Sequence, residues 1–185
     1  MRVLTLTPDI FREHCLRLQA EAELFCPDLI VTIARGGDFV GELMFPEVTH
    51  ISVKRQRPST ETKQDLGYLA KFIRTLPVCL RNAIRITESA CTSAGKHPAA
   101  PLSLGNKETN IISKASRILV VDDAVDSGAT LAAVIDAINT IPGDRTVASA
   151  AITVTKRNPL ISPDYTLYNN RTLVRFPWSM DYSEK

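Results

Sequence analysis

The most constraining feature of this sequence is the run of residues 118–131. Four apolar residues at 118–121 lead into an acidic stretch at 122–126, and Ser-Gly-Ala-Thr at 127–130 opens a pattern of helical spacing. A short, continuous and β-branched apolar run is typical of a strand that is buried on both faces. The passage from such a strand through a polar turn into a helix predicts an α/β fold with parallel strands.

The same order recurs along the chain. Thr7, Pro8 and Asp9 form a helix start, with a hydroxyl cap, a proline in the first turn and an acid at the positive end of the dipole, and this helix is expected to end at Cys26. Right-handed crossovers then give a mainly parallel sheet with helices on both faces. We predict strands over residues 29–34, 48–53, 117–121, 147–155, 165–168 and 172–176, and further helices over about 37–45 and 128–139.

Composition excludes several classes of protein. The 185 residues suffice for one domain with a sizeable core, and a net charge of +2 does not favour nucleic acid or a membrane surface as the main partner. The four cysteines show no C-x-x-C pairing, so neither a disulfide framework nor a zinc framework is predicted. No stretch has the length and apolarity of a membrane span, and the first residues do not resemble a signal peptide, so we expect a cytoplasmic protein.

Residues 122–130 fall where ligands of such sheets bind, beyond the carboxyl ends of the strands. Because neighbouring strand side chains point in different directions, one of Asp122 and Asp123 is suited to a vicinal diol and the other to a metal ion or a structural partner. The helix start that follows presents unpaired N–H groups, which favour a phosphate. The predicted phosphate loop consists of Asp126, Ser127, Gly128, Ala129 and Thr130. A diol site beside a phosphate site suggests a ribose 5-phosphate ligand.

Other known loops fit these residues less well. A Walker-type loop requires a lysine after its last glycine, but Ala129 follows Gly128. A dinucleotide fingerprint needs three spaced glycines, and an EF-hand needs an oxygen ligand where Ala124 lies. The plainest alternative is an acidic turn that only caps a helix, but three crowded carboxylates repel one another unless a cation or hydrogen-bond donors compensate.

Residues 118–131 resemble the PRPP-binding motif of type I phosphoribosyltransferases, in which an apolar strand, two acids and a phosphate loop precede a helix. The fold of that family, a parallel sheet flanked by helices with a small hood, agrees with the alternation described above. Arg35, Gly36 and Gly37 resemble the pyrophosphate loop of the family, because glycine tolerates unusual dihedral angles and a guanidinium binds phosphate oxygens well. Taken alone, this tripeptide is equally consistent with a plain turn. The resemblance covers roughly residues 1–57 and 117–180.

Two further features are similar to the 6-oxopurine branch of the family, whose members act on hypoxanthine, guanine or xanthine. Lys156 follows a predicted strand at the position where those enzymes place a lysine against the purine O6. Val174 lies in a segment similar to the hood that contacts the base through backbone groups, and Leu173 stands where an aromatic residue usually stacks on the base. The plain alternatives are that Lys156 is a solvated strand end and that Pro177-Trp178 only packs the hood.

The resemblance implies transfer of the ribose 5-phosphate of PRPP to a nucleobase with release of pyrophosphate. Asp122 and Asp123 would bind the ribose diol, with Asp123 also a ligand of Mg²⁺, the implied cofactor. Asp126 matches the residue that takes a proton from purine N7, and Arg35 would stabilise the leaving pyrophosphate, so these two are the implied catalytic residues.

We predict one domain over residues 1–185 with two additions. Residues 60–116 form an insertion that is helical over 66–91 and a mobile loop over 93–109, and residues 156–185 form the C-terminal hood. This insertion is longer than the compact 6-oxopurine enzymes need.

Three questions stay open at the level of sequence. The family closes a lid over its site, and either residues 54–60, which lack the Ser-Tyr pair of the most similar enzymes, or residues 93–109 are candidates for it. The acceptor is either a 6-oxopurine or a pyrimidine or specialised base. The third question is whether the protein is instead a regulator that senses PRPP or a nucleotide without turnover. From the family we also expect a homodimer.

Overall fold

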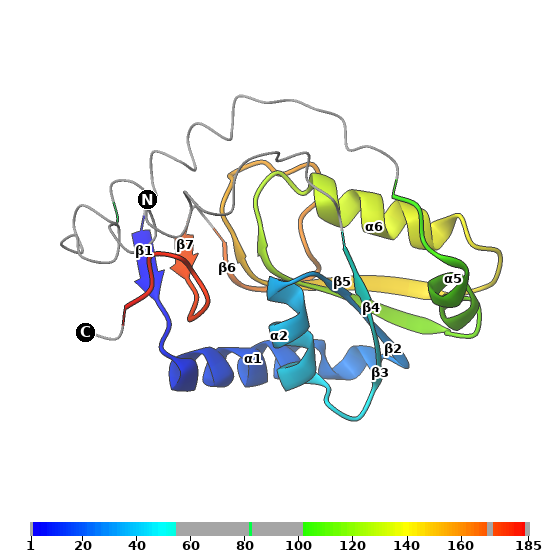
Figure 1. The fold of residues 1–185 in the computed structure, drawn as a ribbon, viewed down its shortest axis with the longest axis horizontal. Coiled ribbons are helices and arrows are strands. Elements are labelled where there is room, and N and C mark those ends of the chain that lie inside the picture. Colours follow the sequence, from blue (N-terminus) through cyan, green and yellow to red (C-terminus); the bar gives the residue numbers. More distant parts are fainter. Residues whose placement is uncertain (1, 55–81, 83–101, 170–171, 184–185) are drawn as a thin grey trace, which may run out of the picture.

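A computed structural model of the protein describes residues 2–54, 82, 102–169 and 172–183. Its centre is a five-stranded sheet in the order β3-β2-β4-β5-β6, with every neighbouring pair parallel (Figure 1). The predicted fold class is therefore confirmed. The strands of this sheet are β2 (Leu29–Ile33), β3 (Thr49–Val53), β4 (Arg117–Val125), β5 (Thr146–Val154) and β6 (Tyr165–Tyr168).

Alternating residues of the central strands send their side chains into two separate cores. On β2, Ile30 packs with helices α1 (Pro8–Ala22) and α2 (Gly36–Met44), whereas Val31 packs with α5 (Asn106–Ile112) and α6 (Ala129–Asn139). One pair of helices thus covers each face of the sheet (Figure 1). Both cores consist mainly of fully buried aliphatic side chains, so the sheet is a rigid platform for whatever lies at its carboxyl edge.

The first helix begins as its sequence predicts. The Thr7 side chain accepts a hydrogen bond from the Ile10 N–H at 3.3 Å, and Pro8 opens the helix. The helix passes into a short 3-10 turn, Glu23–Phe25, and Cys26 ends it in the left-handed region with φ of 49°. Phe11, Cys15 and Leu18 of this helix are buried, whereas Ile10 remains 39% exposed.

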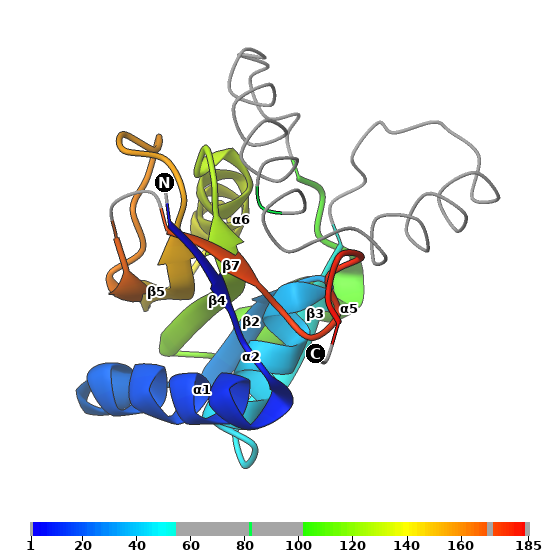
Figure 2. The same ribbon diagram turned by 90° about the vertical axis from the view of Figure 1, so that its left-hand side faces the viewer.

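A second, two-stranded parallel sheet forms the hood. It pairs β1 (Arg2–Thr5) with β7 (Thr172–Arg175), so that two strands far apart in the sequence lie side by side (Figure 2). The Thr153 hydroxyl of β5 donates to the Thr172 carbonyl at 2.7 Å and so anchors β7 to the main sheet. The β1 strand was not among the predicted elements.

Arg175 fixes the hood from within. It is 2% exposed, and its guanidinium donates to Asp181 at 2.8 Å, to the Thr5 hydroxyl at 2.8 Å and to the Asn82 amide oxygen at 2.8 Å. A single buried cation therefore joins β7, which carries it, to Thr5 of β1, to Asp181 and to Asn82. The sequence offered no signal for this contact.

Two of the predicted boundaries are wrong. Residues 106–109 were expected in a mobile loop but form the first turns of α5, whose Ile112 enters the core. The strand predicted to stop at Val121 continues to Val125, because Asp122 and Ala124 still pair with β5. The helix predicted over 66–91 lies outside the described residues except for Asn82, as do residues 55–60 of one lid candidate. Within the described part of the chain, no helix could span a membrane.

Candidate active site

The two segments singled out in the sequence lie in direct contact at the carboxyl edge of the sheet. A Cβ atom built on Gly36 would lie 2.1 Å from the Asp123 carboxyl carbon, and one on Gly37 would lie 2.4 Å from the Val121 carbonyl oxygen. Only glycine permits so close an approach of the first turn of α2 to the backbone and side chains of β4. Arg35, which follows a cis peptide bond at Ala34-Arg35, is exposed beside this contact.

The predicted phosphate loop connects β4 to α6. Gly128 adopts a φ of 74°, in the left-handed region, and α6 begins at the next residue with no side-chain cap. The Ser127 hydroxyl lies 3.4 Å from the Ala129 N–H, at the long end of the hydrogen-bond range. The start of α6 therefore has two properties of an anion site, a positive dipole end and backbone N–H groups of the first turn behind a glycine N-cap.

A neighbouring loop supports this phosphate loop from behind. The Leu160 N–H donates to the Ser127 carbonyl at 2.7 Å, and the backbone of Ile161 passes so near Gly128 that a Cβ there would lie 2.6 Å from the Ile161 oxygen. Gly128 is thus required both by its φ and by the space around it.

Asp126 lies between the acid pair and the phosphate loop and is held by the end of β5. The Thr155 hydroxyl donates to one carboxylate oxygen at 2.9 Å, and the Lys156 ammonium lies 3.5 Å from the other. The Asp126 side chain remains 42% exposed, so it is open to a ligand despite both contacts. Lys156 was expected to meet a base, and the structure places it against Asp126. Thr155 was not among the predicted site residues.

The Asp123 carboxyl group is half-buried and lies against Gly36 at the start of α2. The backbone N–H of Asp123 donates to the Asp122 carboxylate at 2.9 Å. Burial raises the pKa of Asp123 above its ordinary value, and hydrogen bonds with Asp122, the Ala124 backbone and Trp178 counteract part of that rise. The two adjacent acids therefore differ in surroundings.

This environment predicts a pH-dependent effect of Asp123→Asn. A carboxyl group whose pKa is raised in the folded state stabilises the fold fully below its ordinary pKa, and that contribution is lost as pH rises through the raised pKa. The asparagine stays neutral, so it is expected to stabilise the protein relative to wild type more near neutral pH than at about pH 4. Thermal unfolding of both proteins at the two pH values measures this. Equal differences at both would contradict it.

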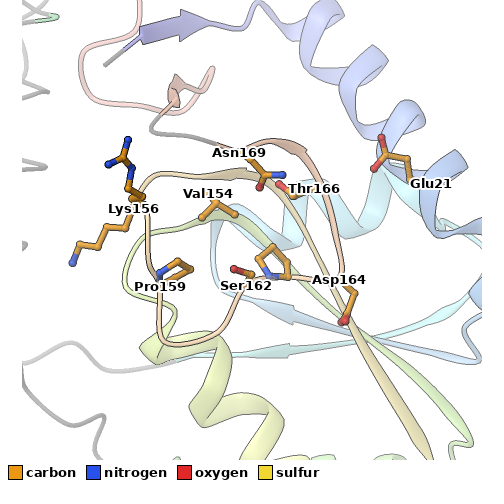
Figure 3. A pocket seen from close by; sticks show the side chains of 10 residues that line it. Glu21, Val154, Lys156, Pro159, Ser162, Asp164, Thr166 and Asn169 are labelled. Carbon is orange, nitrogen blue, oxygen red and sulfur yellow. The ribbon is translucent and has the colours of Figure 1, made fainter.

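The structure does not bring the three residues predicted to contact the base, Lys156, Leu173 and Val174, together around one cavity. Leu173 and Val174 lie on β7 with only 6% and 3% of their surface exposed, so both side chains belong to the hood core. A hollow of about 530 Å³ lies beside Lys156 under the loop that joins β5 to β6 (Figure 3). Of the predicted site residues only Lys156 lines it, so it is separate from the acid pair and the phosphate loop.

Mg²⁺ fits this site only together with a substrate. Among the described residues, no three His, Cys, Asp or Glu side chains converge on a point that could hold a metal ion. Mg²⁺, however, is commonly bound by one or two carboxylates plus substrate phosphates and water. Asp122 and Asp123 supply such a partial set of donors.

Known proteins share this fold. Residues 25–185 match the family model described as "Phosphoribosyl transferase domain". A purine phosphoribosyltransferase from Pyrococcus horikoshii superposes with a TM-score of 0.62 at 16% identity, over 100% of this chain and 99% of that one. A Helicobacter pylori xanthine-guanine-hypoxanthine phosphoribosyltransferase gives 0.61 at 17% identity, over 97% and 95%.

A third solved structure is similar as well. A hypothetical protein from Neisseria gonorrhoeae with bound ppGpp gives a TM-score of 0.64 at 12% identity, over 96% of this chain and 89% of that one. Comparison with curated proteins gives no match. At these identities the likeness to the solved structures is one of fold.

Proposed function

Because this chain belongs to the phosphoribosyl transferase domain family, a family of pentosyltransferases, we propose that it transfers the ribose 5-phosphate of PRPP to a nucleobase. The observation that carries the proposal is the contact between two loops. The start of α6 follows Asp126 after Ser127 and Gly128, and Gly36 at the start of α2 packs against Asp123. One site thereby offers a place for a phosphate, a diol and a diphosphate.

The sugar half of the substrate can be assigned residue by residue. The 5-phosphate would lie on the loop from Ser127 to Thr130, where backbone N–H groups and the helix dipole favour an anion. Asp122 and Asp123 would accept hydrogen bonds from the ribose hydroxyls. Arg35, exposed at the loop after β2, would neutralise charge on the pyrophosphate, with Gly36 and Gly37 letting the backbone approach it.

In the reaction, the bond between C1 of the ribose and the pyrophosphate oxygen breaks as a bond to the base nitrogen forms. Charge develops on the leaving pyrophosphate, and Arg35 stabilises it. The attacking base must lose a proton, and Asp126 accepts it through the carboxylate that Thr155 orients at 2.9 Å. Mg²⁺, when bound to PRPP beside Asp122 and Asp123, would supply further neutralisation of the diphosphate.

For the acceptor we propose a 6-oxopurine. Lys156 supports this, since an ammonium donates hydrogen bonds and selects a carbonyl oxygen over the amino group of adenine. Its ammonium pairs with Asp126 at 3.5 Å, and 23% of its side chain is exposed. Because Asp126 and Lys156 lie so close together, one purine ring could contact both, with its N7 at Asp126 and its O6 at Lys156.

The test is pyrophosphate release from PRPP with Mg²⁺ and a panel of bases: hypoxanthine, guanine, xanthine, adenine, uracil and orotate. Release with at least one 6-oxopurine, and faster than with adenine, is the expected result. Release only with a pyrimidine would support the phosphoribosyl transfer reaction but contradict the assignment of a 6-oxopurine as the acceptor. No release with any base would refute the enzyme assignment.

Lys156→Ala is expected to lower kcat/KM for the preferred oxopurine by about 10- to 100-fold, the usual loss for a hydrogen bond from a charged donor. Turnover with adenine should change much less, because adenine lacks the carbonyl. The readout is the ratio of kcat/KM values for the two bases. Lys114→Ala, at an exposed position beyond α5, is the matched control. An unchanged ratio would remove the argument for an oxopurine.

A second candidate function is sensing of a phosphorylated nucleotide without turnover. Two observations favour it: the similar fold of the Neisseria gonorrhoeae protein with bound ppGpp, and the burial of Leu173 at the position expected to stack on a base. Calorimetry with PRPP, GMP and ppGpp separates the two functions. Tight nucleotide binding without pyrophosphate release from any base would support sensing.

A further inference from the structure

We infer that Thr155 is a positioning residue for Asp126. Its hydroxyl fixes one oxygen of the Asp126 carboxylate, so that the proton acceptor stays in place when the Lys156 ammonium leaves it for the carbonyl of the base. The inference rests on the proposed function and deepens it, because it assigns a part in proton transfer to a residue that acts only through this carboxylate.

The first observation is where the hydroxyl proton of Thr155 goes. The hydroxyl oxygen lies 2.9 Å from Asp126 Oδ1 and 3.5 Å from the Val125 carbonyl oxygen. A hydroxyl has one proton, and a charged acceptor at the shorter distance forms the stronger bond. The Val125 carbonyl also accepts the Thr155 N–H at 2.9 Å, so it is already satisfied. The Thr155 hydroxyl therefore donates to the carboxylate.

The second observation is how firmly this donor is held. Thr155 is 8% exposed and continues β5, whose last residue, Val154, pairs with Val125 at the end of β4. Asp126 follows Val125, so donor and acceptor each lie one residue beyond a fixed pair of strands. A β-branched side chain is also stiff at χ1. The hydroxyl thus has little freedom to move away from the carboxylate.

The third observation is that the other carboxylate oxygen has a different kind of partner. The Lys156 ammonium lies 3.5 Å from Asp126 Oδ2, at the end of a long side chain that is 23% exposed. When that ammonium donates to the O6 of a purine, it withdraws from Oδ2 and leaves this oxygen to accept the proton from the base. Thr155 still holds Oδ1, which keeps Oδ2 directed at the base. Without the hydroxyl, a carboxylate whose side chain is 42% exposed would turn toward water.

Thr155→Val tests this by removing the hydroxyl and keeping the β-branched shape. With PRPP, Mg²⁺ and the preferred base, kcat should fall about 10- to 100-fold, the range expected for a hydrogen bond to a charged group, while the KM for PRPP should change little. Thr155→Ser restores the donor and should recover most of kcat. Thr146→Val makes the same change at an exposed position at the other end of β5 and, as the matched control, should leave kcat near wild type.

Two results of this comparison would overturn the inference. One is a Thr155→Val protein with the kcat of wild type. The other is a Thr155→Ser protein as slow as Thr155→Val, since the methyl group and not the hydroxyl would then matter.

Combining Thr155→Val with Asp126→Asn tests the route of the effect. The combined variant should be no slower than Asp126→Asn alone, because Thr155 acts only through the carboxylate. A further loss of kcat as large as the one that Thr155→Val causes in the wild type would show a separate role and contradict the inference.

A thermal double-mutant cycle tests the contact itself without any ligand. Thr155→Val, Asp126→Ala and the double variant should show non-additive changes in Tm, because each single change removes the same hydrogen bond. Strictly additive changes would overturn the link between the two side chains. If wild type releases no pyrophosphate with any base, the proposed function fails, and the cycle still decides whether Thr155 holds Asp126.

Discussion

Asp126→Asn is expected to lower kcat by about 10²–10⁴-fold with the preferred base, which is the usual contribution of a positioned general base. The asparagine is close in shape and still accepts a hydrogen bond from Thr155, so the fold and the phosphate loop should stay in place. Steady-state pyrophosphate release measures the effect, and the KM for PRPP should change little, because the 5-phosphate is bound by the neighbouring backbone.

The matched control for this variant is Asp136→Asn, an exposed acid further along α6. It makes the same change in net charge on the helix that follows Asp126 and should leave kcat near that of wild type. If Asp126→Asn turned over at the wild-type rate, the assignment of proton transfer to this residue would be wrong, while the assignment of the PRPP site would stand.

Gly128→Ala should have the largest effect on the sugar site. A left-handed φ of 74° costs an alanine roughly 1–2 kcal/mol. The new methyl would also lie 2.6 Å and 2.8 Å from the Ile161 carbonyl oxygen and nitrogen, so backbone has to move. We expect a lower Tm and a rise in the KM for PRPP well beyond tenfold, measured by unfolding and by kinetics.

Gly105→Ala is the control for this second variant. Gly105 also precedes a helix, α5, but its φ is −72° and its Cβ would meet only the flexible end of the Glu108 side chain. Its PRPP kinetics should be unchanged. A Gly128→Ala protein that bound PRPP with the wild-type KM would show that the α6 start is not the phosphate site.

The segments that carry the site were predictable because their signals are local. The apolar run before Asp122 and the Thr7 cap each follow from a few consecutive residues, and the structure has the expected strand and helix there. That the loop after β2 lies beside β4 was predictable too, because parallel strands bring their carboxyl ends to one edge.

The contacts that orient the site were not predictable, because each joins residues far apart in sequence. Thr155 donates to Asp126 from 29 residues away, and Arg175 reaches Asn82 across 93. The strand β1 was missed for the same reason, since four residues carry little periodicity and their partner is β7. The continuation of β4 through Asp122 and Asp123 was also missed, although it is a local feature. Polar residues usually end a buried strand, so the strand pattern predicted an end at Val121.

The pairing of β1 with β7 has a consequence for how the protein is made. Residues 2–5 leave the ribosome before the strands of the main sheet, and their partners, residues 172–175, leave it after those strands. The hood, with Arg175 and Trp178, therefore forms only after the main sheet has all its strands. The proposed sugar-phosphate site at the start of α6 is therefore synthesised before β7 can pair with β1.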